Sequence, residues 1–330
     1  MTRQLQITTT ASRPTRIAEF DGIRAFAILM IMTCHVSYGL QPNSPVGQYL
    51  GGTFNFVFFI MSALLAGLSA KPAVAEGARK YMGRRLLRIV PDLWLFLTAY
   101  LIVALACGMQ MPPKAVAMNY AMLGWFAKLP HIGHLWFVTM IMMCYAMFFL
   151  LNRFRHSSFA KIIFTVVCVT GQVALERIGM PGYMFLILLV CGFVYLYAQH
   201  IVMYAFDCQR YIYIYIIALA VNGLFLWMLY RNVVSIGHLP YYYISCVCGI
   251  LAIVSLFAAF RNVKIGKIVL LISALSYQLY LVHHPLCNLS IYKPVVEKPY
   301  LAVILVYVLS FVLAWLLKSA TDSIVKLTRK

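Results

Sequence analysis

Long apolar runs with few charges dominate the chain and constrain its fold more than any other feature. Of its 330 residues, 63% are hydrophobic and only 11% are charged, whereas about 25% are charged in an average soluble domain. A lipid bilayer accommodates this apolar surface, but each spanning N–H and C=O group then needs a partner within the protein, so the spans must be helices or a closed barrel. The runs lack the alternation of barrel strands. We therefore predict an all-α integral membrane protein.

Ten of these runs are long enough to cross a hydrocarbon core about 30 Å thick, and they predict a bundle of about ten transmembrane helices. The predicted spans are 22–40, 50–70, 93–109, 135–151, 161–176, 181–198, 211–230, 240–260, 268–290 and 300–317. The run at 161–176 is the weakest because it is short and contains Gly171 and Gln172. Residues 114–127 are moderately apolar and are expected to lie on the membrane surface or to re-enter the bilayer.

The lysines and arginines indicate how the bundle is oriented. If the N-terminus is cytoplasmic, the inner segments contain twenty of these residues and the outer segments six, with Arg24 inside the first span. This bias follows the positive-inside rule, and it predicts that both termini are cytoplasmic. The net charge of +19 does not indicate nucleic-acid binding, because the basic residues form short clusters between apolar runs.

One membrane domain with short polar ends is expected. Residues 1–20 are predicted to be a cytoplasmic tail, 21–318 the membrane-embedded domain and 319–330 a basic cytoplasmic tail. Most of the nine cysteines lie inside apolar runs and are interpreted as small buried apolar side chains. Cys246 and Cys248 are one residue apart, which is too close for a typical zinc pair. Neither a disulfide framework nor a metal site is predicted.

The first span contains two ionisable side chains, Arg24 and His35. Such groups are costly in a membrane and are functional candidates. They are eleven residues apart, so in a helix they share a face at a separation of about 16 Å. Two interpretations stay open for each. Arg24 is either a functional cation or an anchor that reaches the headgroups, and His35 is either a reactive group or a hydrogen-bonded histidine between helices.

A second candidate motif is the basic segment 81–91, which lies in a predicted cytoplasmic loop. Read as a helix, the segment presents Tyr81, Arg84, Arg85 and Arg88 on one face. One interpretation is an interfacial helix that is attracted to anionic membrane lipid. The other is a phosphate clamp, because three guanidinium groups on one face suit bidentate binding of phosphate.

Two further motifs place histidines in the outer half of the bundle. Residues 276–285 align Ser276, Tyr280 and either His283 or His284 along one stripe, just before Pro285. Such a stripe either lines a cavity or packs helices together. Residues 131–137 contain His134 and Trp136, which an interfacial aromatic belt also explains. Arginines at the inner end and histidines at the outer end together suit a long phosphorylated donor that enters from the cytoplasm.

The ordered set of motifs resembles the acyltransferase-3 family of integral-membrane O-acyltransferases, and the resemblance covers about the whole chain. The matching segments are 20–25 followed by His35, F-F-x-x-S-G at 58–63, R-R-x-x-R-I-x-P at 84–91, L-W-F at 135–137 and S-Y-x-L-Y-L-x-H-x-P at 276–285. The last motif singles out His283 over His284. Ala25, Phe56 and Ala63 depart from the usual family residues, which affects local packing more than the chemistry.

The resemblance implies transfer of an acyl group, most often acetyl from acetyl-CoA, to a hydroxyl of a cell-envelope polysaccharide or lipid-linked glycan at a bacterial inner membrane. His35 would then be the general base, and Asp21 would orient Arg24. The residues expected to hold the phosphates of coenzyme A are Arg24, Arg84, Arg85 and Arg88. Those expected to bind substrate are Ser62, His134, Trp136, Ser276, Tyr277, Tyr280 and His283. No metal is implied.

Two other classes of protein compete with an acyltransferase. The first is a transporter or flippase for a glycan or amphipathic substrate. All eight carboxylates are expected in tails, loops or span ends, whereas proton-coupled carriers commonly use one within the membrane, and no inverted repeat is visible. The second is a sensor or assembly scaffold, which has no need of arginines and histidines at opposite depths.

Overall fold

The computed structural model is an all-α bundle, as predicted, and it describes residues 17–69, 77–179, 182–205, 211–237, 239–261, 263–288 and 298–327. The helices are α1 (Ala18–Leu40), α2 (Pro45–Leu68), α3 (Ala78–Ala106), α4 (Pro113–Tyr120), α5 (Trp136–Arg153), α6 (Ser158–Arg177), α7 (Tyr183–Leu196), α8 (Ala198–His200), α9 (Tyr211–Tyr230), α10 (Leu239–Phe260), α11 (Lys267–Leu286) and α12 (Pro299–Leu327). Most of the predicted N-terminal tail (1–16) and the last three residues lie outside the described part.

Within the described residues, nine helices are long and apolar enough to cross a membrane, which confirms a multi-pass membrane bundle. Each predicted span coincides with a helix. One of these helices is too short for a typical span: α7, at the predicted span 181–198, has 14 residues, whereas a span needs about 20. The chain then continues through α8 into a π-helical turn at Ile201–Ala205.

Two helices extend beyond the spans predicted for them. Helix α3 begins at Ala78, so the segment 81–91, predicted as a helix within a cytoplasmic loop, lies in the first part of a helix that continues past Pro91. Asp92, which was expected at a span end, is therefore inside α3, 6% exposed, and it accepts a 2.8 Å hydrogen bond from Nε2 of Gln278. Helix α12 continues to Leu327 and includes residues 319–327 of the predicted tail.

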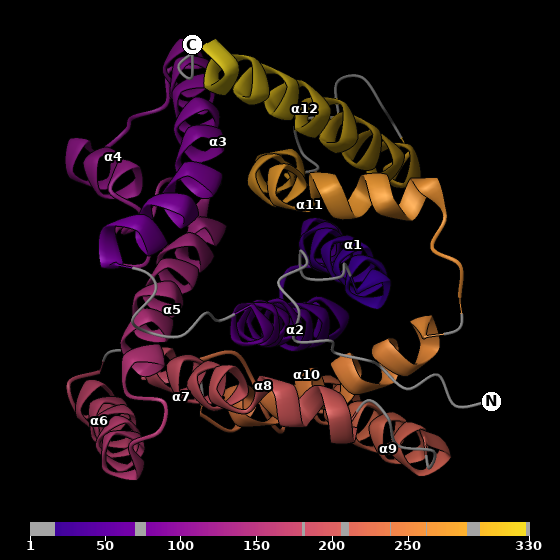
Figure 1. Cartoon of the computed structure of the whole chain (residues 1–330). Coiled ribbons are helices and arrows are strands. Elements are labelled where there is room, and N and C mark those ends of the chain that lie inside the picture. Colours follow the sequence, from indigo (N-terminus) through magenta and orange to yellow (C-terminus); the bar gives the residue numbers. More distant parts are fainter. Residues whose placement is uncertain are drawn as a thin grey trace.

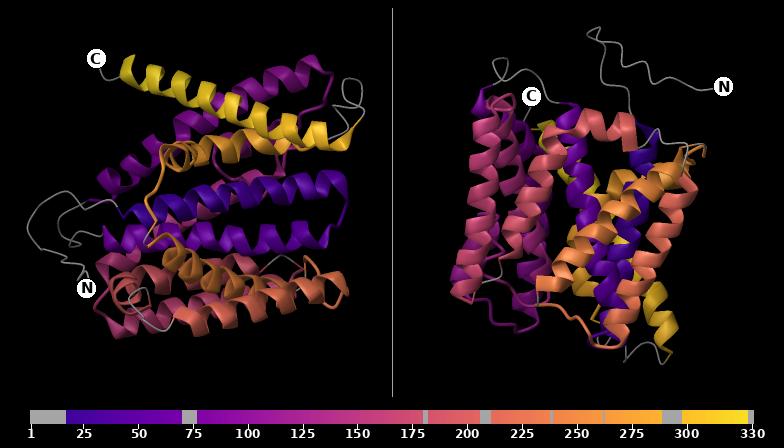
Figure 2. Two further views of the ribbon diagram at one scale, coloured as in Figure 1. Left: turned by 90° about the vertical axis from the view of Figure 1, so that its right-hand side faces the viewer. Right: turned by 90° about the horizontal axis from the view of Figure 1, so that it is seen from below.

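Helices α1 and α2 lie in the middle of the bundle (Figures 1 and 2). They are flanked by α11 and α12 on one side and by α7, α9 and α10 on the other. The outermost helices expose apolar side chains, including Phe159, Leu219 and Ile268 at 72%, 78% and 75%. Lipid covers such surfaces in a membrane protein. The polar side chains discussed below lie in the interior between α1, α3, α5 and α11.

Helices α2 and α10 approach each other closely because glycines occupy their interface. A Cβ atom at Gly249 of α10 would lie 2.6 Å from the Cβ of Phe56 and 3.0 Å from the backbone oxygen of Thr53 in α2. Small residues of this kind allow close packing of helices in membranes. The close approach also keeps the first turns of α10 beside the N-terminal half of α2, where both helices line the cavity described in the next section.

Replacing Gly249 with leucine is expected to separate α2 from α10 and to lower the thermal unfolding midpoint of the detergent-solubilised protein. Overpacking of this kind costs about 1–3 kcal/mol. Gly223→Leu is the matched control, because a Cβ at position 223 of α9 meets no atom within 4 Å. Equal midpoints for the two variants in a thermal-shift assay would contradict the close packing described for α2 and α10.

Candidate active site

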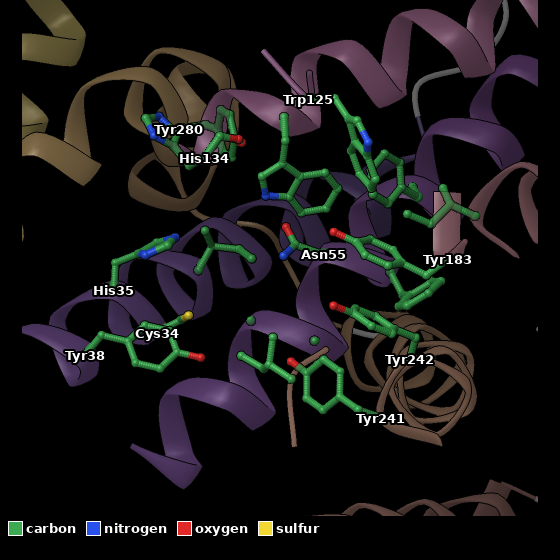
Figure 3. A pocket seen from close by; sticks show the side chains of 18 of the residues that line it. Cys34, His35, Tyr38, Asn55, Trp125, His134, Tyr183, Tyr241, Tyr242 and Tyr280 are labelled. Carbon is green, nitrogen blue, oxygen red and sulfur yellow. The ribbon is translucent and has the colours of Figure 1, made fainter. Parts of the chain in front are cut away.

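A cavity of about 340 Å³ lies at one end of the bundle, between the C-terminal half of α1, the N-terminal half of α2 and the beginnings of α5, α7 and α10. Figure 3 shows His35 and Tyr38 on one side of this cavity and Tyr183 and Tyr242 on the opposite side, with Asn55 between them. The polar or aromatic side chains that line it are His35, Tyr38, Asn55, Trp125, Lys128, His134, Trp136, Tyr183, Tyr241, Tyr242 and Tyr280.

Four histidines from three parts of the chain gather beside this cavity. The ring of His35 in α1 has its centroid 5.2 Å from that of His283 and 4.4 Å from that of His284, both in α11. His134, which lies just before α5, stacks on His284 at 4.5 Å and lies 5.4 Å from His283. His35, His134 and His283, the three histidines predicted at the outer end, therefore meet. The ring of His284 is closer to that of His35 than the ring of His283 is. We call these four side chains the histidine cluster.

Hydrogen bonds to backbone oxygens orient the rings of the cluster. Nδ1 of His283 donates to the carbonyl of Leu279 at 2.9 Å, and Nδ1 of His284 donates to the carbonyl of His131 at 2.6 Å. The hydroxyl of Tyr280 donates to the carbonyl of His134. A neutral histidine that donates from Nδ1 has a lone pair on Nε2. The backbone thus fixes which nitrogen of each α11 histidine can accept a proton.

Two of these histidines are buried and have ring nitrogens that lack a polar partner. His283 is 0% exposed and His134 is 4% exposed. Within the described residues, Nε2 of His283 and both ring nitrogens of His134 have no hydrogen-bond partner. Buried nitrogens of this kind are uncommon in folded proteins and mark places where function competes with stability. Among all the described residues, no group of three or more His, Cys, Asp or Glu residues is placed to hold a metal ion.

Arg24 lies at the other end of α1, and Asp21 and Ser273 hold it there. Its Nη1 atom is 3.8 Å from Oδ1 of Asp21 and donates to Oγ of Ser273 at 3.5 Å. Ser273 in turn donates to Oδ1 of Asp21 at 2.8 Å. The structure thus brings Asp21 to Arg24 as predicted. Sequence reasoning missed Ser273, although it lies three residues before Ser276 and hence on the same stripe of α11.

The contacts at both ends show that α1 and α11 run parallel. Arg24 meets Ser273, and His35 meets His283. Arg24 precedes His35 by eleven residues, and Ser273 precedes His283 by ten, which correspond to about 16 Å and 15 Å along a helix. The two helices are therefore in register over this distance, with one polar contact at each end and apolar packing between.

The three arginines of the segment 81–91 differ in burial: Arg84 and Arg88 are exposed, whereas Arg85 is half-buried. The guanidinium of Arg85 lies over the ring of Tyr145 in α5, 4.8 Å from its centroid, and 5.4 Å from the ring centroid of Tyr81. Arg84 and Arg88 are four positions apart and so lie on one face of α3. We call the four arginines predicted to hold the donor phosphates, Arg24, Arg84, Arg85 and Arg88, the arginine group.

The remaining predicted site residues are divided between the cavity and the helix contacts. Trp136 and Tyr280 line the cavity. Tyr277 instead donates to the carbonyl of Ile89 in α3 at 3.1 Å, which links α11 to the arginine-bearing part of α3. Ser276 is buried and Ser62 is half-buried, and neither lines the cavity.

Comparison with known proteins assigns the family. A family model described as an acyltransferase domain matches residues 17–319, which include both the histidine cluster and the arginine group. No curated protein and no solved structure matches the chain significantly. The family match covers nearly the whole chain, and the structure is a multi-pass α-helical bundle. The chain therefore belongs to the acyltransferase-3 family, and it is an integral-membrane acyltransferase.

Proposed function

We propose that this protein transfers an acetyl or other short acyl group from cytoplasmic acyl-CoA to a hydroxyl of a cell-envelope glycan at the bacterial inner membrane, with His35 as general base. The observation that carries the proposal is the arrangement of α1, which carries Arg24 at one end and places His35 against the α11 histidines at the other. The twenty-to-six charge bias supports placing the arginine end in the cytoplasm.

The arginine end suits the phosphates of the donor. Arg24 comes from α1, and Arg84, Arg85 and Arg88 come from α3. Guanidinium groups bind phosphate oxygens through paired, charge-assisted hydrogen bonds. The Asp21–Ser273 pair holds Arg24 on one side. From this position a flexible thioester arm needs to extend about 16 Å along α1 to reach His35.

At the histidine end, His35 would take the proton from the acceptor hydroxyl while the hydroxyl oxygen attacks the thioester carbonyl carbon. The C–S bond then breaks, the proton passes from His35 to the departing sulfur, and the products are the ester and free coenzyme A. Among the described residues that line the cavity there is no carboxylate. His134 and Tyr280 line the cavity, and His283 contacts His35. In this proposal the three residues position the acceptor or stabilise the oxyanion.

Family membership favours transfer over transport. Buried Asp92 is a carboxylate inside a helix, but it already accepts a hydrogen bond from Gln278. This contact joins α3 to α11.

His35→Ala is expected to reduce transfer of labelled acetyl to envelope glycan by about 10²–10⁴-fold, the usual contribution of a general base. The assay uses membranes that contain equal amounts of wild-type and variant protein. The matched control is His156→Ala, which changes an exposed histidine after α5 and should leave transfer unchanged. Wild-type transfer by the His35 variant would exclude this residue as the base.

Arg24→Ala is expected to raise KM for acetyl-CoA by about tenfold or more, because a charged hydrogen bond to phosphate is worth about 1.5–3 kcal/mol. KM for the acceptor should change little. Ser273→Ala should shift the same constant in the same direction by a smaller factor, since Ser273 acts on the substrate through Asp21 and Arg24. Arg177→Ala, on exposed α6, is the control. An equal rise in both KM values would show that Arg24 stabilises the fold and does not bind the donor.

A further inference from the structure

Four aromatic side chains cover the side of the cavity that faces away from His35. Tyr183 and Tyr242 are stacked, with ring centroids 3.9 Å apart and an angle of 10° between the planes. Trp125 lies 5.0 Å from Tyr183 and 5.6 Å from Trp136. We call these four residues the aromatic wall. In Figure 3 the hydroxyl groups of Tyr183 and Tyr242 point into the cavity, toward the side that carries His35 and Tyr38.

The segment that contributes Trp125 is firmly held. The backbone N–H of Trp125 donates to Oγ1 of Thr139 in α5 at 3.1 Å. The Asn119 side chain donates to the carbonyl of Ala127 at 2.8 Å, and it is itself 2% exposed. Residues 114–127, which the sequence placed on the surface or in a re-entrant loop, thus fold back to form part of the cavity lining.

Backbone strain in the same segment supports a functional role. Met122 and His131 have φ angles of 62° and 52°, in the left-handed region that non-glycine residues rarely adopt. Such residues cluster at ligand-binding sites. The carbonyl of His131 also accepts the hydrogen bond from His284. The segment therefore connects the aromatic wall to the histidine cluster.

Lys128 supplies the one ionised side chain among the cavity-lining residues of the described chain. The Lys128 side chain is exposed, and its Cδ atom lies 3.6 Å from where a Cβ added to Gly133 would be. Among the described residues that line the cavity, one lysine and no carboxylate favour an anionic ligand and disfavour a cationic one.

The size and the polarity of the cavity point to a sugar. A volume of about 340 Å³ is at the lower end of small-molecule sites and accommodates about one or two pyranose rings. A pyranose has an apolar C–H face, which suits an aromatic face, and hydroxyl groups at its edge. Tyrosine and tryptophan offer the same combination of an apolar body and a polar tip. The hydroxyls of Tyr183 and Tyr242, with the amide of Asn55, supply hydrogen-bonding groups at the edge of the ring.

We propose that the aromatic wall and Lys128 form the acceptor subsite and that the preferred acceptor is a carboxylate-bearing sugar whose ring packs on the indoles of the wall while its hydroxyls meet the hydroxyls of Tyr183 and Tyr242. The placement of one of its hydroxyls beside His35 rests on the proposed acyl transfer, whereas binding of the sugar does not depend on that reaction. Trp125, Tyr183 and Tyr242 are specificity-determining residues in this scheme, and Lys128 selects the charge.

Saturation-transfer NMR on the full chain in lipid nanodiscs tests the proposal with three probes: methyl glucuronide, methyl glucoside and glucosamine. The expected order of affinity is glucuronide, then glucoside, then glucosamine, with about a fivefold preference for the first over the second, equivalent to about 1 kcal/mol. Lys128→Gln should abolish this preference while leaving glucoside binding unchanged. Equal affinity for the three probes, or an undiminished preference in the Lys128 variant, would overturn the charge assignment.

Trp125→Ala should weaken binding of both glucuronide and glucoside by about tenfold, whereas Trp125→Phe should restore most of it because the ring face is kept. Trp227→Ala is the matched control, since Trp227 lies on α9 with 55% of its surface exposed. Thermal midpoints equal to that of wild type show that the variants are folded. Wild-type affinity in Trp125→Ala would overturn the assignment of the wall.

The same samples separate this inference from the proposed function. His35→Ala should bind glucuronide normally while losing acyl transfer. Normal transfer by the wild type together with no sugar binding would overturn the acceptor subsite alone. Sugar binding as expected, with undiminished transfer in His35→Ala, would overturn the role of His35 and leave the subsite intact.

Discussion

The parallel pairing of α1 and α11 is the constraint on which the rest of the site depends. Each end of the pair has a polar contact, Arg24 with Ser273 and His35 with the α11 histidines. A slip of one residue would turn one polar face about 100° away from the other and leave charged or polar groups against apolar side chains, which is costly. The register is thus set at two points about 16 Å apart, and the distance between the two ends of the site follows from it.

Helix α11 also fixes the position of α3. Gln278 donates to Asp92, and Tyr277 donates to the carbonyl of Ile89, so two consecutive residues of α11 hold the middle of α3. Because α3 is one helix from Ala78 to Ala106, fixing its middle also fixes the arginines one to two turns earlier. Arg85 then reaches Tyr145 in α5. Buried polar contacts, which are few in this apolar bundle, therefore decide where the cations lie.

The sequence predicted what helical periodicity and lipid determine. Lipid requires long apolar helices, so the spans were readable, and a helix places Arg24 and His35 on one face wherever it packs. The aromatic wall was not readable, because Tyr183 and Tyr242 stack only once α7 and α10 have packed on the same side of α2. The continuity of α3 was also missed: the segment 81–91 was predicted as a helix within a loop, separate from the span after Pro91, whereas the two form one helix.

The apolar stretch between the two ends also limits what can connect them. Between Arg24 and His35, the buried side chains of α1 include Ala27, Ile28 and Met32, each 0% exposed. A charged group would lose its hydration there without a partner, at a cost of several kcal/mol. In the proposed reaction the thioester arm that bridges the two ends is uncharged, while the phosphates stay with the arginines and the acidic sugar stays near Lys128. Under this proposal, charges placed only at the two ends keep a polyanionic donor and an anionic acceptor from repelling each other at close range.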